Sequence, residues 1–291
     1  MALRGKKPNS ENQRLRMLLS GPAGVGKTTA AIQMPKPYII DCERGAQNPE
    51  YTKKIIAAGG EIFEPADMHD IIKEVRELMA GGHDFLTVVI DSITAPYHAL
   101  GDEGERKVGT EFSKNYKQYA DKFVRRLVHL LTVIDMNVVV IAHEKAKWGK
   151  DAKGDPSVLG VTFDGYQKLD YMFDLYLQLS KDEKRKRKAF VEKTRYEQFP
   201  DGDSFEWSYS ELARRMGDDL TRDVHAIELA TPEQVARLEY LMAPLTDDQT
   251  KAWGIDKALK GVESIADLTA ERIAAAIAFI EKKAAVDAEK L

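Results

Sequence analysis

The chain reads Gly21-Pro22-Ala23-Gly24-Val25-Gly26-Lys27-Thr28 near its beginning, which matches the pattern G-x-x-x-x-G-K-T at every fixed position. At average composition such a match arises by chance in roughly one chain of this length in a hundred. An apolar run, residues 15–19, precedes the loop, and residues 28–32 can continue as a helix. This strand-loop-helix context predicts a phosphate-binding loop rather than an ordinary glycine turn.

The loop residues have complementary roles toward ATP and Mg²⁺. Glycines let backbone N–H groups point inward around the phosphates, with the positive field of the following helix behind them. Lys27 is expected to hold the β- and γ-phosphates, and Thr28 to offer its hydroxyl to Mg²⁺. The residues predicted to contact the nucleotide are Gly21, Pro22, Ala23, Gly24, Val25, Gly26, Lys27, Thr28 and Thr29.

A second acidic element ends the apolar run 85–90, where Asp91 follows. We expect Asp91 to hold Mg²⁺ through water. Many buried strands end in aspartate only to cap the next turn, so this motif by itself leaves both interpretations open. The complete phosphate-binding loop upstream favours the magnesium role.

Short apolar runs alternate with helical patterns from residue 14 to about 179, which is typical of β-α-β units and a mostly parallel sheet. The predicted strands span 14–20, 37–41, 61–63, 85–91, 137–143 and 174–179. Apolar side chains at helical spacing predict a helix over 111–134. A β-hairpin is predicted next, with strands near 189–196 and 205–209 joined by a turn at 200–203.

Four parts follow from these patterns: a tail over 1–13, an α/β core over 14–210, a connector over 211–230 and a helical module over 231–291. Thr231-Pro232-Glu233 has the residues of a helix start, and Thr269 opens an alanine-rich helix that ends near residue 285. Only thirteen residues precede the first predicted strand, so we expect no N-terminal DNA-binding or polymerisation domain.

The 43 basic and 47 acidic residues give a net charge of −4, which excludes a uniformly basic nucleic-acid coat. Basic runs occur at 145–153 and 184–188, and either run alone is more often a solvated face. No apolar run approaches the ~20 residues of a membrane span, and no secretory signal is recognisable. The single cysteine, Cys42, excludes an internal disulfide. We therefore expect a soluble cytoplasmic protein without a membrane partner.

Tyr38-Ile39-Ile40-Asp41-Cys42-Glu43 places a glutamate just beyond the second predicted strand. With the phosphate-binding loop, this makes the chain resemble the RecA superfamily of P-loop ATPases. The resemblance implies a RecA-like α/β core, with a mostly parallel central sheet flanked by helices, an antiparallel hairpin extension and a small C-terminal helical module. It also implies that Glu43 orients the water that attacks ATP. Asp41 is the alternative base, and Glu43 could instead pair with Arg44 or a neighbouring loop.

The same resemblance places a sensor of the γ-phosphate at His143, where RecA itself commonly has glutamine. Histidine departs from that pattern but can donate a hydrogen bond to phosphate; the alternative role is a structural cap on the strand. Residues 144–164 are predicted to form a long polar loop. RecA-like recombinases carry a DNA-binding loop at this place, and the second candidate loop, 94–110, is more acidic.

The predicted DNA contacts in the first loop are Lys145, Lys147, Trp148, Lys150 and Lys153. The lysines would neutralise backbone phosphates and Trp148 would stack on a base, which suits single strands. A mobile solvated loop is the alternative. Lys193-Thr194-Arg195 resembles the basic pair that RecA-like subunits present to the ATP of a neighbour, which implies a homo-oligomeric ring or filament. Alternating cations also keep an edge strand soluble.

Over residues 14–209 the layout is similar to the short single-strand annealing ATPases of bacteriophages, the Sak type. This implies DNA-stimulated hydrolysis of ATP to ADP and phosphate, binding of single-stranded DNA, and annealing or pairing of homologous strands in the bacterial host cytoplasm. A single-strand binding protein is an expected partner. Two other classes stay open: a loader or signalling ATPase that acts on proteins, and a DNA-binding module that clamps ATP with little turnover.

Overall fold

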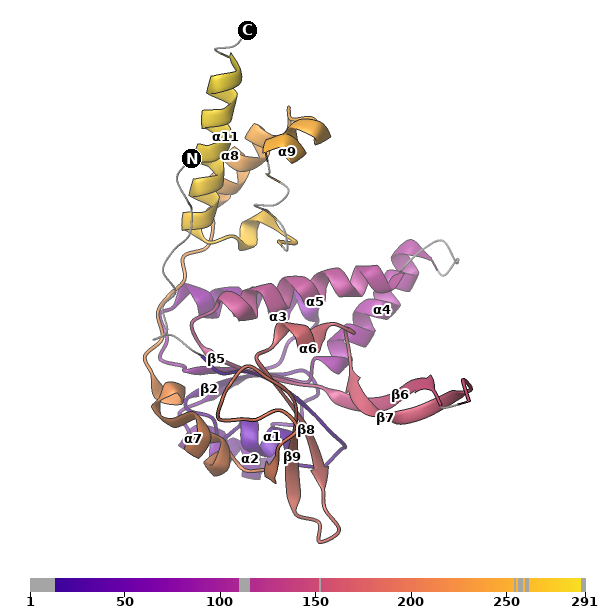
Figure 1. The fold of residues 1–291 in the computed structure, drawn as a ribbon. Coiled ribbons are helices and arrows are strands. Elements are labelled where there is room, and N and C mark those ends of the chain that lie inside the picture. Colours follow the sequence, from indigo (N-terminus) through magenta and orange to yellow (C-terminus); the bar gives the residue numbers. More distant parts are fainter. Residues whose placement is uncertain are drawn as a thin grey trace. The chain divides into compact units, whose positions relative to one another are not determined.

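The computed structural model describes residues 14–109, 116–151, 153–253, 255, 259 and 262–288 (Figure 1). Within this range the chain divides into two compact units. The first, called the sheet unit, comprises residues 14–65, 84–96 and 136–224. The second, called the helical unit, comprises residues 66–83, 97–135 and the described part of 225–291.

The sheet unit is built on one eight-stranded sheet with the order β10-β9-β8-β1-β5-β4-β2-β3. Its strands are β1 (Arg16–Ser20), β2 (Pro37–Asp41), β3 (Glu61–Phe63), β4 (Thr87–Asp91), β5 (Asn137–Ile141), β8 (Leu175–Lys181), β9 (Arg187–Thr194) and β10 (Ser204–Glu206). The six strands from β8 to β3 pair in parallel, whereas β9 and β10 extend the sheet antiparallel. The predicted α/β fold with a mostly parallel sheet and an antiparallel extension is confirmed.

Parallel strands bring their carboxyl ends to one edge of the sheet, and ligands of open α/β sheets bind outside that edge. The loops after β1, β2, β4 and β5 therefore meet there. All five residues of β5 are buried, which explains the apolar run over residues 138–141, and its first residue, Asn137, is a buried polar side chain with hydrogen-bond partners. The middle of the sheet is thus a rigid support for whatever its loops carry.

The helices of the sheet unit are α1 (Lys27–Ala31), α2 (Pro49–Ala57), α6 (Leu169–Met172) and α7 (Tyr209–Met216), followed by the 3₁₀ turn η1 (Gly217–Thr221). Ser208 caps α7 by accepting the backbone N–H of Glu211. Leu212, Met216 and Leu220 are buried in the same core as the strands. The first half of the predicted connector is therefore part of the sheet unit's core.

The helical unit holds α3 (Met68–Ala80), all but the first turn of α4 (Thr94–Val108), α5 (Tyr116–Val133), α8 (Pro232–Met242), α9 (Asp247–Trp253), the 3₁₀ turn η2 (Ile265–Asp267) and α11 (Ala270–Ala288). Thr231 is the N-cap of α8, as the sequence predicted, and it also forms a capping box with Gln234. Asp267 is buried and forms ion pairs with Arg76 of α3 and Arg126 of α5. The C-terminal helices are thus joined to helices from the middle of the chain.

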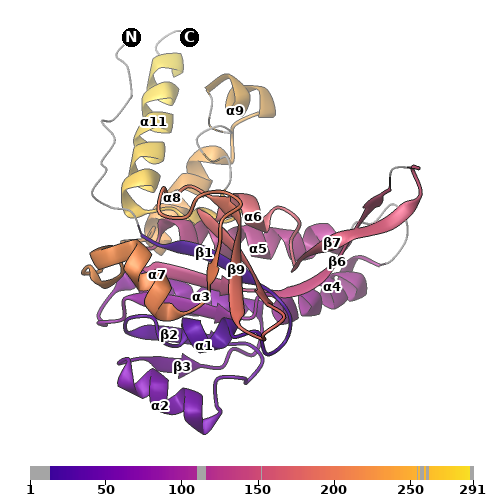
Figure 2. The same cartoon turned by 60° about the horizontal axis from the view of Figure 1, so that its bottom comes forward.

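Two predicted loops are wrong. Residues 144–164 form an antiparallel two-stranded ribbon, β6 (His143–Lys150) and β7 (Pro156–Asp164), which extends away from the main sheet in both views (Figures 1 and 2). We call this ribbon the arm. The side chain of Asp151 accepts the N–H groups of Lys153 and Asp155, which builds the turn that a β-hairpin needs.

The second candidate loop, 94–110, is the helix α4 over its described part, Thr94–Val108. The helix predicted over 111–134 is present as α5 from Tyr116, and residues 111–115 lie outside the described residues. Throughout the part of the chain that the structure describes, no helix combines the length and apolar character of a membrane span.

Candidate functional site

The predicted phosphate-binding loop joins β1 to α1 at the carboxyl edge of the sheet. Val25 is fully buried and anchors the loop, while Pro22, Ala23 and Gly24 are exposed. Gly26 has a φ of 104°, and a Cβ at this position would lie 2.8 Å from the Nε atom of Arg187. Glycine is therefore favoured at position 26 by its left-handed backbone conformation, and a larger residue would also displace the flexible Arg187 side chain.

Two further loop residues have defined partners. The hydroxyl of Thr29 lies 3.2 Å from that of Tyr51 in α2. A Cβ on Gly21 would lie 2.6 Å from the carbonyl oxygen of Leu179 in β8, so β8 borders the start of the loop. The loop is thus held from both sides, and its exposed middle is the part that a phosphate chain can reach.

The Lys27 amine donates to the carbonyl oxygens of Gly21 (2.6 Å) and Pro22 (3.1 Å). Burial lowers the pKa of Lys27, against the opposing effect of Asp91, Glu144 and Glu43. The amine therefore lies within its own loop, where it is desolvated and close to three carboxylates. The two carbonyl oxygens are neutral acceptors. Phosphate oxygens bound in the loop would give this half-buried cation an anionic partner and a stronger, charge-assisted hydrogen bond.

The two predicted magnesium ligands meet. Thr28 Oγ1 donates to Asp91 Oδ2 at 2.6 Å, so the hydroxyl oxygen and the carboxylate oxygen face the same point. Burial raises the pKa of Asp91 to about 6, and the Thr28 hydrogen bond opposes this shift. Hydroxyl and carboxylate oxygens are hard donors of the kind that Mg²⁺ prefers, so these residues fit the ion. Among the described residues no cluster of three or more His, Cys, Asp or Glu side chains could hold a metal. Phosphate and water oxygens would supply the remaining ligands of a Mg²⁺ ion held by Thr28 and Asp91.

Glu43 connects the ends of three neighbouring strands, β2, β4 and β5. Its carboxylate accepts a hydrogen bond from the hydroxyl of Ser92, directly after β4. Nε2 of His143, the first residue of β6, lies 2.9 Å from Glu43 Oε1 and 3.1 Å from Oε2. The predicted base and the predicted sensor are therefore in contact, at the point where the arm begins.

Asp41, the alternative base, is the buried last residue of β2, directly before the loop that carries Glu43. Its two carboxylate oxygens accept the N–H groups of Gly45 (3.0 Å) and Ala46 (2.8 Å). These bonds fix the backbone that presents Glu43, so the geometry gives Asp41 a structural part and favours Glu43 as the base. Burial also raises the pKa of the neighbouring Cys42 thiol to about 12, with Asp91 adding to the effect, so this cysteine stays protonated.

Two residues beside the loop were missed from the sequence. The Arg187 side chain lies against Gly26, and the indole N–H of Trp207 donates to the Gly26 carbonyl oxygen at 3.3 Å. Arg187 and Trp207 also share a backbone hydrogen bond of 2.9 Å. Arg187 belongs to a basic run that stands out in the sequence, but only the antiparallel return of β9 brings it to the loop.

The predicted DNA contacts are distributed along the arm. Residues alternate between the two faces of a strand, so Lys145 and Lys147 share one face while Trp148 and Lys150 share the other. Trp148 is 69% exposed, whereas the Lys145 amine is paired with Asp164 at 2.9 Å. Lys153 follows in the turn. The structure thus brings an exposed aromatic ring and a lysine together on one face.

Both ends of the arm are fastened by Thr94. Its hydroxyl accepts the backbone N–H of His143 at 2.9 Å and donates to the carbonyl oxygen of Asp164 at 2.7 Å. His143 is the first residue of β6 and Asp164 the last of β7. Thr94 therefore ties the base of the arm to the segment that follows β4.

Lys193 and Arg195 are engaged within their own unit. The Lys193 amine donates to the carbonyl oxygens of Asp170 and Phe173, both at 2.6 Å, and burial lowers its pKa, with Arg195 adding to this. The Arg195 guanidinium pairs with Asp174 at 2.6 Å. Their role as a cationic finger toward a neighbour's ATP stays a prediction, because it requires these contacts to break.

Comparison with known proteins agrees with the site's geometry. A family model described as an AAA domain, AAA_24, matches residues 13–221, which include the phosphate-binding loop, Glu43, Asp91 and the arm. A search of curated proteins found no match to the chain. Since the matched segment covers more than half of the chain and contains the whole candidate site, the chain belongs to the AAA-domain family AAA_24, and its core is a P-loop ATPase-type domain.

Proposed function

We propose that the chain is an ATP-hydrolysing recombination protein that binds single-stranded DNA with its arm and promotes annealing or pairing of homologous strands. One observation carries the proposal: the predicted catalytic carboxylate, Glu43, contacts His143, and His143 is the first residue of the arm. A change at the nucleotide can therefore reach the arm through one side chain. The proposal further includes a single-strand binding protein as partner and assembly of several copies into a ring or filament.

Each residue of the site has a defined part in hydrolysis. Lys27 leaves its carbonyl partners for the β- and γ-phosphates, and Glu43 accepts a proton from the attacking water. The oxygen of that water bonds to the γ-phosphorus while the bond to ADP breaks. Mg²⁺, when held by Thr28 and Asp91, neutralises charge on the phosphate oxygens. To accept that proton, the Glu43 carboxylate must turn away from Ser92 and His143 toward the water. His143 then loses its contact with Glu43 and is free to change position.

The arm has the chemistry of a single-strand contact. An aromatic ring that stacks on bases contributes about 1–3 kcal/mol per base without reading sequence. Lys150 lies two residues from Trp148 on the same face, where its amine can reach the phosphates that flank a stacked base. Lys147 on the opposite face can contact a strand that curves over the edge of the ribbon. These features support DNA as the partner.

A second candidate is an ATPase that acts on a protein. Four large apolar side chains of the arm are exposed, namely Trp148, Val158, Leu159 and Val161. Val158 lies opposite Trp148 in the ribbon, so both belong to one face. An apolar patch of this kind also suits a protein surface. The two candidates differ in what Trp148 touches, which a binding assay can decide.

The test is fluorescence anisotropy with a labelled thymidine oligonucleotide, with and without ATP, combined with an ATP hydrolysis assay. We expect the double variant Lys147→Ala/Trp148→Ala to bind the oligonucleotide about 10- to 100-fold more weakly, because it loses a stacking platform and a phosphate contact. Its affinity for ATP should be unchanged, since neither residue is near the phosphate-binding loop in sequence or in strand order. Oligonucleotide should raise the hydrolysis rate of the wild type and not that of the variant.

A matched control is Lys168→Ala/Tyr171→Ala, which removes an exposed lysine and a tyrosine that is 73% exposed outside the arm. This control should bind like the wild type. Equal oligonucleotide affinity in all three proteins would overturn the arm as the DNA contact. A wild type that binds no oligonucleotide would overturn the DNA proposal and favour a protein partner. Oligonucleotide binding that needs ATP, in a wild type that hardly hydrolyses it, would instead identify an ATP-clamped module.

A further inference from the structure

The turn between β8 and β9 concentrates positive charge on a protein whose net charge is negative. Residues 181–188 read Lys181-Asp182-Glu183-Lys184-Arg185-Lys186-Arg187-Lys188, with six basic and two acidic residues, while the whole chain carries −4. No residue of this stretch is apolar. We call residues 181–188 the basic turn. Like charges so close together repel one another, so the turn is better suited to holding a polyanion than to stabilising the fold.

The backbone of the basic turn is well fixed. Asp182 donates its N–H to the Lys186 carbonyl oxygen at 2.9 Å and accepts the N–H of Arg185 at 2.8 Å. Its side chain also accepts the N–H of Lys186 at 2.8 Å. One of the two acidic side chains is therefore used to build the turn. The lysines project from a defined scaffold, which reduces the entropy lost when they engage a ligand.

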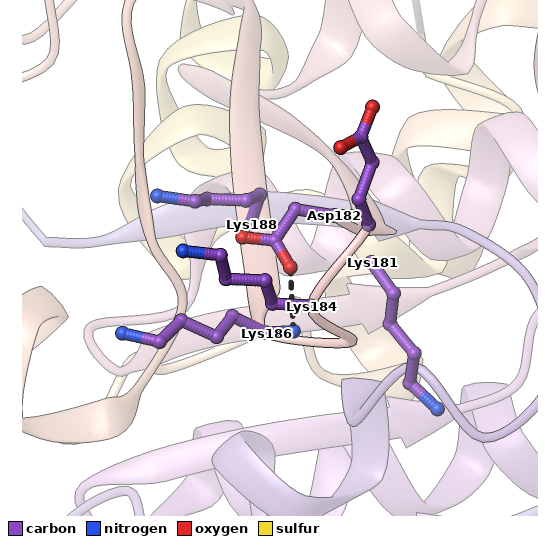
Figure 3. A pocket seen from close by; sticks show the side chains of 6 residues that line it. Lys181, Asp182, Lys184, Lys186 and Lys188 are labelled. Atoms are coloured by element: carbon purple, nitrogen blue, oxygen red, sulfur yellow. Dashed lines mark hydrogen bonds between the residues drawn. The ribbon is translucent and has the colours of Figure 1, made fainter.

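The lysines line a shared, shallow surface. An open hollow of about 670 Å³ is lined by Lys181, Asp182, Glu183, Lys184, Lys186 and Lys188 (Figure 3). The amines of Lys184, Lys186 and Lys188 extend to the same side of the turn, whereas Lys181 points away from them (Figure 3). The amine nitrogen of Lys186 lies 3.8 Å from the Oε2 atom of Glu206. Within the described residues, Lys184 and Lys188 have no ion-pair partner.

The chemistry of the surface selects its ligand. Three exposed or half-buried amines in a row suit an extended chain of phosphates better than one enclosed phosphate, which buried donors would surround. The absence of apolar side chains from 181–188 argues against a membrane, because interfacial anchors combine cations with buried apolar groups. It argues equally against an ordinary protein interface, whose centre is apolar and aromatic.

We propose that the basic turn binds the phosphate backbone of a single-stranded nucleic acid, with Lys184, Lys186 and Lys188 as the contacts. This deepens the proposed function, on which it rests for the class of partner, but it uses residues outside the arm. The strands that carry the turn also border the phosphate-binding loop, through Leu179 at Gly21 and Arg187 at Gly26. A single-stranded nucleic acid bound to the basic turn would therefore lie next to the nucleotide site.

The test is the salt dependence of binding to a labelled thymidine oligonucleotide. Each phosphate contact with a single strand contributes about 0.7 to the slope of log affinity against log salt. The triple variant Lys184→Gln/Lys186→Gln/Lys188→Gln should therefore lose about two from the slope and bind about 100-fold more weakly at 0.1 M salt. The variant Lys184→Arg/Lys186→Arg/Lys188→Arg keeps the charges and should bind like the wild type.

A matched control removes three exposed lysines from helices, Lys73→Gln/Lys117→Gln/Lys122→Gln, and should keep the wild-type slope. The arm variant Lys147→Ala/Trp148→Ala is measured alongside. If only the arm variant loses affinity for the oligonucleotide and the basic-turn variant binds like the wild type, this inference alone is overturned. If only the basic-turn variant loses affinity, the inference is supported and the arm is overturned as a DNA contact. A wild type that binds no oligonucleotide would overturn both, as would turn-dependent binding to phosphatidylserine vesicles only.

Discussion

The nucleotide site and the arm are built in opposite ways from adjacent strand ends. In the nucleotide site nearly every polar group has a partner within the protein: Thr28 with Asp91, Ser92 with Glu43, and Lys27 with its own loop. In the arm, Trp148 and most of its neighbours are exposed, and Thr94 hydrogen-bonds the two strand ends at the base. The proposed chemistry thus belongs to a site whose groups hold one another in place, and the proposed partner recognition to a ribbon whose side chains are exposed.

Glu43 links the two regions, because it lies in the nucleotide site and contacts His143, the first residue of the arm. Glu43→Gln keeps an acceptor for Ser92 but removes the proposed general base, so ATP turnover should fall about 1000-fold while ATP still binds. Steady-state hydrolysis and nucleotide binding measured together check this. The exposed helix residue Glu77→Gln is the charge-matched control. Normal turnover in Glu43→Gln would place the base elsewhere.

The core site should also be sensitive in stability, unlike the arm. Asp41→Ala leaves the N–H groups of Gly45 and Ala46 without their acceptors in a buried loop, which should lower the free energy of unfolding by about 2–3 kcal/mol. Urea denaturation measures this. Glu197→Ala, an exposed carboxylate, and Trp148→Ala in the arm should each change it by less than about 0.5 kcal/mol. A destabilised Trp148→Ala would mean that the arm is part of the folded core.

The smallest effect is expected at Thr94, the junction of the two regions. Thr94→Val keeps the shape of the side chain but removes both hydrogen bonds at the base of the arm. The free energy of unfolding should fall by about 1 kcal/mol. Basal hydrolysis should persist, whereas its stimulation by oligonucleotide should fall several-fold because the arm is less firmly attached. Thr94→Ser retains the hydroxyl and should restore stimulation. Full stimulation in Thr94→Val would show that coupling does not pass through the base of the arm.

The sequence predicted the parts of the fold that depend on local pattern. Strands β2 and β3 occur at the predicted residues, because short apolar runs bounded by polar loops are unambiguous there. The arm was predicted as a loop because its strands are exposed on both faces, so neither an apolar run nor an alternation marks them. The phosphate-binding loop and Asp91 could be proposed from the sequence for a similar reason, because each is marked by a pattern of consecutive residues.

Contacts that depend on strand order could not be derived in this way. Glu43, Ser92 and His143 meet because β2, β4 and β5 are neighbours in the sheet, although about fifty residues separate each from the next in the chain. Arg187 reaches Gly26 only because β9 returns antiparallel beside β8. Without an order of strands, a glutamate after one strand and a histidine after another remain separate candidates.

The ion pairs of Asp267 make the C-terminal helices inseparable from the middle of the chain. This carboxylate is 1% exposed and is shared by two arginines, from α3 and α5. A chain shortened before residue 231 would leave both guanidinium groups without their buried counter-charge, and breaking such a pair costs about 3–5 kcal/mol. The described helices near the C-terminus therefore help to hold the helical unit together, and a chain cut before residue 231 is expected to lose stability in that unit.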